Sequence, residues 1–155
     1  MSHTSRLVAI AAGSVAVALI GVAPFVHAAP TTRLAQLHGS MYARKAVATA
    51  RVIQVSKDDF RIQITAMGLP DPAMIHVKPQ RHIYLAWALD KFNPHAMLEP
   101  IVLKPNHSTG NYSGNGVVML QHVTRIVVTA DKSARQHAPT KPEMIVLDSS
   151  SKAAI

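Results

Sequence analysis

Polar and apolar residues alternate strictly in the stretch FRIQIT, residues 60–65. Phe60, Ile62 and Ile64 would lie on one face of an extended chain, and the other face would carry only polar side chains. This period of two is typical of a β-strand with one buried face. The valine-rich residues 45–55 predict a second strand, and the polar residues 56–59 between the two predict a hairpin turn.

The stretch HIYLAWALD, residues 82–90, is apolar on both of its faces. Ile83, Leu85, Trp87 and Leu89 would share one face, and the other face also consists mostly of apolar residues. A strand of this kind is predicted to be central in its sheet, because both of its faces must be covered. Trp87 is the only tryptophan of the chain, and we expect it to be a core anchor.

Four further short runs extend the strand pattern. Residues 99–105 form a short run with a proline near each end, at positions 100 and 105, which predicts an edge strand because proline cannot donate a backbone hydrogen bond to a neighbour. Residues 117–123, 125–131 and 143–149 are rich in valine, isoleucine and leucine. Roughly seven short strands with turn signals between them are typical of an antiparallel sandwich.

These runs predict an all-β protein with one domain. We expect an antiparallel, immunoglobulin-like β-sandwich of about seven strands over residues 45–150. Residues 29–44 lack clear periodicity and are expected to form a loosely attached leader, and residues 151–155 a tail.

The first 28 residues have the three parts of an export signal. Arg6 supplies a positive charge, residues 7–22 form an uncharged apolar run, and residues 26–28 (Val-His-Ala) fit a cleavage site. We expect a signal helix that is removed at this site. The alternative is an uncleaved anchor, since residues 7–26 are just long enough to cross a bilayer. With either outcome, the rest of the chain is expected outside the cytoplasm.

The composition of the chain limits the kinds of site that it can form. Cysteine is absent from the 155 residues, which excludes disulfides, thiolate metal sites, blue-copper electron transfer and a cysteine nucleophile. Lysine and arginine number 16 against 8 acidic residues, so the formal net charge is +8. This excess favours acidic partners, such as an anionic component of the cell envelope. The aromatic and basic signatures of nucleic-acid binding are missing, and we expect no nucleic-acid partner.

Histidine and methionine lie close together in residues 74–76 and 95–97. A ring nitrogen beside a thioether is a ligand pair that soft metals accept. The candidate metal ligands are His76, His82, His95 and Met97. No pairing of a nucleophile with a base can be proposed, so we expect no catalytic residue, no enzymatic activity and no required cofactor.

Four motifs follow one another in a distinctive order. MGLPDP at residues 67–72 precedes YLAWALD at 84–90, STGNYSG at 108–114 and the closing hairpin IVVTADKSARQHAPTKPEMIVL at 126–147. This ordered set resembles the extracytoplasmic, C-terminal domain of the anti-sigma-K factor family. The resemblance implies a β-sandwich on the outer side of the membrane.

The chain also departs from that family. Only six residues precede the apolar run, so we expect no cytoplasmic sigma-binding domain. Asp131 stands where the family tends to have glutamate, the loop at 132–143 lacks the usual paired glycines, and residues 74–81 are extra length. The resemblance therefore implies a fold and a location, but not the capture of a sigma factor.

Together these features predict a secreted, non-enzymatic module that binds a protein or an envelope component through its end loops. A membrane would be a partner only if the signal were retained. The candidate binding residues are Ser108, Asn111, Tyr112, Arg135 and His137. The alternative is an extracytoplasmic protein that binds copper or another soft metal through histidine and methionine.

Overall fold

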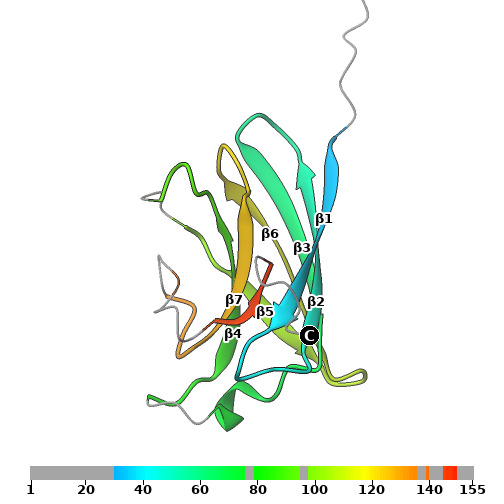
Figure 1. Ribbon diagram of the computed structural model, residues 1–155, viewed down its shortest axis with the longest axis vertical. Helices are drawn as coiled ribbons and strands as arrows, with labels where there is room; N and C mark the ends of the chain where they lie inside the picture. Colours follow the sequence, from blue (N-terminus) through cyan, green and yellow to red (C-terminus); the bar gives the residue numbers. More distant parts are fainter. Residues whose placement is uncertain (1–29, 76–78, 95–97, 136–138, 140–144, 150–155) are drawn as a thin grey trace, which may run out of the picture.

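The computed structural model describes residues 30–75, 79–94, 98–135, 139 and 145–149, and these form an antiparallel β-structure (Figure 1). Its strands are β1 (Thr32–Gly39), β2 (Val47–Gln54), β3 (Asp59–Met67), β4 (Ile83–Leu89), β5 (Ile101–Asn106), β6 (Asn111–Met119), β7 (Arg125–Asp131) and β8 (Ile145–Asp148), with one 3-10 turn, η1 (Pro72–Met74). The prediction of an all-β, antiparallel fold is confirmed. The expected signal helix lies outside the described residues. No helix in the described ranges has the length and apolar character needed to span a membrane.

The hairpin of β2 and β3 forms as the alternating pattern predicts. Phe60, Ile62, Ile64 and Ala66 are all buried on the inner face of β3, and the residues between them are exposed. The strand is long enough to pair with β2 on one side and with β6 on the other. Its buried face therefore contributes four successive side chains to the core.

The segment expected to be a leader contains strand β1. It pairs with β2 over seven residues, from Thr32 opposite Ile53 to His38 opposite Val47. Its apolar signal is weak, because Leu37 is its only fully buried side chain while Leu34 faces outward and is 71% exposed. The backbone pairing with β2, rather than side-chain periodicity, holds this strand in place.

The sheet closes on itself as a barrel in the order β1-β2-β3-β6-β5-β4-β7-β8, so the predicted two-layer sandwich is replaced by one continuous sheet. Closure depends on a short contact in which His38 pairs with Asp148 and Gly39 with Leu147. This contact gives the ends of β1 and β8 a partner. A closed sheet removes the edges that a sandwich leaves exposed.

Strand β5 is not the edge strand that its prolines predict. Ile101 to Leu103 pair with β4, and the following residues, Lys104 to Asn106, pair with β6. The strand thus bridges two neighbours in succession. An ideal Cβ added to Gly114 of β6 would lie 2.7 Å from the carbonyl oxygen of Val102, so glycine permits this close crossing.

Two apolar clusters stabilise the barrel. The larger cluster fills the interior, and small side chains on β2 and β4 face larger ones on the other strands, as in other small barrels. The smaller cluster consists of Leu85, Trp87 and Val127 on the outer face of β4 and β7, with Leu98 and Ile145 packed against it. Strand β4 is central, as predicted, because β5 and β7 flank it and both of its faces are covered.

Trp87, the expected core anchor, is fully buried, but it lies in the smaller outer cluster and not inside the barrel. Its indole Nε1 donates a hydrogen bond of 2.8 Å to the hydroxyl of Thr129. That hydroxyl in turn donates to the carboxylate of Asp131, which is also fully buried. A polar chain of three side chains thus runs beneath the outer cluster.

Candidate functional site

The structure separates the residues that the sequence nominates for binding. Ser108 and Arg135 are exposed, and Asn111 is half-buried at the start of β6. Tyr112 is also half-buried, and its ring packs edge-on against Tyr84 with 5.0 Å between centroids. Tyr112 is therefore a packing residue, and His137 lies outside the described residues.

The nominated metal ligands are not brought together. His76, His95 and Met97 fall outside the described residues, and His82 is exposed. The backbone N–H of His82 donates to the carbonyl of Asp131 at 2.9 Å. Among the described residues, no group of three or more His, Asp or Glu side chains could hold a metal ion.

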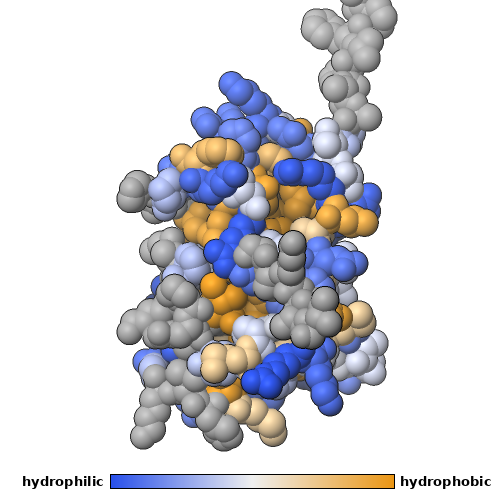
Figure 2. Space-filling model, viewed as in Figure 1, coloured by the Kyte–Doolittle hydropathy of each residue, from blue (hydrophilic) through white to orange (hydrophobic). Residues whose placement is uncertain are grey.

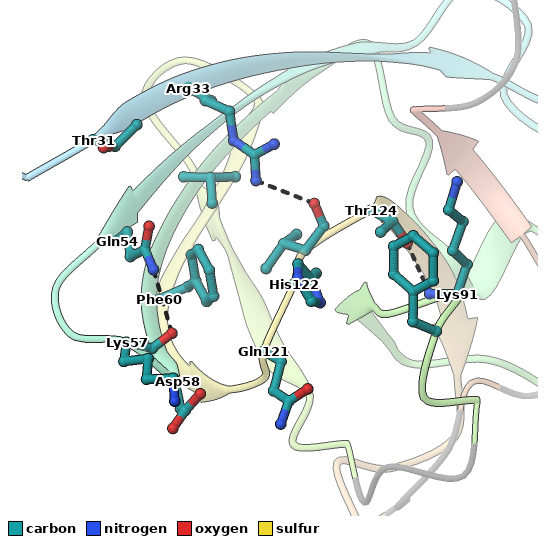
Figure 3. A pocket seen from close by; sticks show the side chains of 13 residues that line it. Thr31, Arg33, Gln54, Lys57, Asp58, Phe60, Lys91, Gln121, His122 and Thr124 are labelled. Carbon is teal, nitrogen blue, oxygen red and sulfur yellow. Dashed lines mark hydrogen bonds between the residues drawn. The ribbon is translucent and has the colours of Figure 1, made fainter.

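Among the cavities formed by the described residues, the largest given by the structure lies at one end of the barrel, the upper end in Figure 1. We call it the mouth, and its volume is about 890 Å³. It is lined by the start of β1, the end of β2, the β2–β3 turn, the β6–β7 connection and the turn after β4. Figure 3 shows these segments converging on one space. Closure of the barrel is what brings them together.

The floor of the mouth is apolar and its rim is basic. Val52, Phe60 and Val123 form the floor, and each is buried because it also belongs to the main core. Figure 2 shows the same contrast, with orange apolar residues lying between blue hydrophilic ones at the upper end of the molecule. Because buried side chains fill the interior beneath this floor, a ligand would bind at the mouth and not inside the barrel.

Three cationic side chains from different segments line the mouth. Arg33 comes from β1, Lys57 from the β2–β3 turn and Lys91 from the turn after β4. The lining includes one carboxylate, that of Asp58, and one titratable ring, that of His122. With the histidine neutral, the formal charge of these groups is 3 − 1 = +2.

Hydrogen bonds position the segments that carry these cations. The Arg33 guanidinium donates to the carbonyl of Val123 at 3.3 Å, which ties β1 to the β6–β7 connection (Figure 3). The backbone N–H of Lys91 donates to the Thr124 hydroxyl at 2.9 Å. The ammonium of Lys91 lies 4.8 Å from the centroid of the neighbouring Phe92 ring.

Asp90 braces the two connections that meet beside the mouth. One of its carboxylate oxygens accepts from the backbone N–H of Phe92 at 2.9 Å, and the other accepts from that of His122 at 3.2 Å. The Nδ1 of His122 is 3.6 Å from the second oxygen. Asp90 is only 4% exposed. Its buried carboxylate therefore holds the backbone of the two connections in place, while the cationic side chains at the mouth face the solvent.

Sequence reasoning missed the mouth. Its cations are isolated in the sequence, at positions 33, 57 and 91, and no local cluster of charge points to them. The only signal was the polar turn at residues 56–59, which reads as an ordinary hairpin connection.

Comparisons with protein-family models, with curated proteins and with solved structures give no match for this chain. The class of the protein is therefore defined by its own geometry, as a small closed antiparallel β-barrel with a basic hollow at one end.

Proposed function

We propose that the protein is an exported, non-enzymatic binding module whose mouth holds an acidic group of an envelope component. The observation that carries this proposal is the meeting of Arg33, Lys57 and Lys91 around one hollow that contains a single carboxylate, Asp58. Cations that converge on a concave site attract anions more strongly than the same charges spread over a surface. A hollow of this volume accommodates a ligand of moderate size or a segment of a polymer.

Export is supported by the sequence. Residues 1–28 carry the pattern of a signal peptide, and the chain resembles the extracytoplasmic domain of anti-sigma-K factors. A location outside the cytoplasm would expose the mouth to phosphate- and carboxylate-bearing envelope components. The absence of cysteine is compatible with this location, because both apolar clusters form without disulfides.

Fluorescence anisotropy with labelled polyphosphate tests the binding function. The mouth variant combines Arg33→Gln, Lys57→Gln and Lys91→Gln. A matched control combines Arg44→Gln, Lys45→Gln and Lys104→Gln, which are exposed positions away from the mouth and remove the same number of charges. An exposed charge contact contributes roughly 0.5 kcal/mol, so the loss of three contacts costs about 1.5 kcal/mol and the mouth variant should bind about tenfold more weakly.

The matched control should lose much less affinity, and the difference between the variants should shrink as salt is added. Equal losses in both variants would show that the net charge alone, and not the mouth, attracts the anion. Unchanged binding by the mouth variant would refute the proposed site.

A further inference from the structure

Exposed apolar side chains lie on the outer face of the sheet beside the mouth. Val55 is paired through its backbone N–H with the carbonyl of Asp59, and Asp59 is opposite Met119 on β6. In the next row, Ile53 is opposite Arg61, which is opposite Val117. Val55, Val117 and Met119 are 46%, 50% and 80% exposed, respectively.

One more exposed apolar residue flanks the same end of the barrel. Phe92, which lines the mouth after β4, is 68% exposed. We call Val55, Phe92, Val117 and Met119 the apolar rim. Arg61 and the cations of the mouth lie among these side chains, so this end of the molecule is both basic and apolar.

The middle of the same outer face is mostly polar. The row next to Val117 joins Leu34, Arg51, Gln63 and Asn115, and the row after it joins Gln36, Thr49, Thr65 and Ser113. Leu34 is the one apolar residue of these two rows. The apolar rim is thus separated from the opposite end, where Val47 and Met67 are 43% and 50% exposed. The two ends offer comparable apolar side chains. Among the cavities described, only the mouth is lined by three cationic side chains.

The path of the chain also distinguishes the two ends. Thr31, next to the first described residue, lines the mouth. The uncharged apolar run at residues 7–22 therefore joins the barrel at the mouth end through a short segment. During export, this run would hold the mouth end close to the lipid surface.

We propose that the mouth end docks on an anionic lipid surface. Headgroup phosphates would lie against the cations of the mouth, and the apolar rim would enter the boundary between headgroups and acyl chains. Basic side chains combined with exposed apolar ones are the combination that binds proteins to anionic membrane interfaces. This inference rests on the proposed function, because it names the anionic component that the mouth recognises.

Vesicle co-flotation tests this docking. The chain from Ala29 onward is suitable, because all eight strands and both apolar clusters lie within residues 30–149. It should bind phosphatidylcholine vesicles that contain phosphatidylglycerol, and it should not bind vesicles of phosphatidylcholine alone. Equal binding to both vesicle types would overturn the proposed role of anionic lipid.

Matched variants locate the docking surface. Val117→Thr with Met119→Gln removes apolar contacts at the mouth, and Val47→Thr with Met67→Gln makes the same changes at the opposite end. Partial burial of one valine and one methionine corresponds to roughly a tenfold change in vesicle affinity. The first variant should show this loss, and the second should bind the vesicles as the unmodified chain does.

The outcomes separate this inference from the proposed function. If both apolar variants float with anionic vesicles as well as the unmodified chain, the lipid docking is wrong, whatever happens with soluble polyphosphate. If the second variant loses as much as the first, the mouth is not the docking end. If the Arg33, Lys57 and Lys91 variant keeps its affinity for polyphosphate, the proposed function itself fails.

Discussion

The hydroxyl of Thr129 links two buried polar groups, and its removal should destabilise the fold more than its size suggests. It accepts the indole N–H of Trp87 at 2.8 Å and donates to the carboxylate of Asp131. All three residues are fully buried. In Thr129→Val the side-chain volume is nearly kept, but the indole N–H loses its acceptor and the carboxylate loses one donor.

The magnitude follows from these two losses. An unsatisfied buried N–H costs about 1–3 kcal/mol, and a lost hydrogen bond to a charged group costs about 1.5–3 kcal/mol. Because the two losses share one hydroxyl and are not additive, we expect Thr129→Val to lower the free energy of unfolding by about 3 kcal/mol. Thr129→Ser keeps the hydroxyl and removes one buried methyl group, so it should cost only about 1 kcal/mol.

Urea unfolding followed by intrinsic fluorescence measures both variants, since Trp87 is the only tryptophan and reports on this site. The double variant Trp87→Phe with Thr129→Val, followed by circular dichroism, should be less destabilised than the sum of the single variants, because no indole N–H is left without an acceptor. If the valine variant is as stable as the serine variant, or more stable, the polar chain does not stabilise the fold as argued.

Two further predictions concern the barrel interior. Gly114→Ala should destabilise the fold by about 1–3 kcal/mol, and by more than Gly116→Ala. The new Cβ at position 114 would lie 2.7 Å from the backbone oxygen of Val102, whereas the one at position 116 would meet only the side chain of Ile101, at 2.8 Å. Thermal unfolding would rank the two variants, and the reverse order would contradict the close crossing of β5 and β6. Burial, with smaller contributions from Tyr112 and Asp71, raises the pKa of Tyr84 above its ordinary value of 10.0. The folded chain thus retains the Tyr84 proton at a pH where the unfolded chain loses it. The free energy of unfolding therefore keeps its full value below the ordinary pKa of tyrosine and falls as the pH rises above that pKa. Tyr84→Phe should lower the free energy of unfolding by about 1 kcal/mol at neutral pH, because the 2.7 Å hydrogen bond from the Tyr84 hydroxyl to the Pro70 carbonyl is lost. At alkaline pH the urea midpoint of this variant should fall less steeply than that of the unmodified chain. If the two midpoints fall in parallel with pH, the assignment to Tyr84 is refuted.

The strands that periodicity predicts are those whose side chains carry a regular pattern. The alternation in β3 and the apolar character of β4 on both faces are visible in the sequence, and the structure places both strands as expected. Strand β1 was missed because Arg33 and Ala35 occupy positions on the same face as the buried Leu37 and dilute the apolar pattern.

The closure of the sheet could not be predicted from local pattern. A sandwich and a barrel use the same short antiparallel strands, and here the difference depends on two residue pairs between β1 and β8. The mouth could not be predicted for the same reason, because Arg33 and Lys91 become neighbours of one hollow only after closure. The burial of Trp87 was predictable, but the face on which it is buried was not, since both faces of β4 are apolar.

The packed interior separates the roles of the side chains at the mouth. Phe60 and Val123 form its floor and also belong to the main core, so their replacement would change binding and stability together. Lys57 and Lys91 are exposed on turns, so their charge can change with little effect on the core. A function carried by the cationic side chains at the mouth can therefore vary between related chains while the barrel beneath them is retained. For the same reason, the charge variants can test binding in a protein that stays folded.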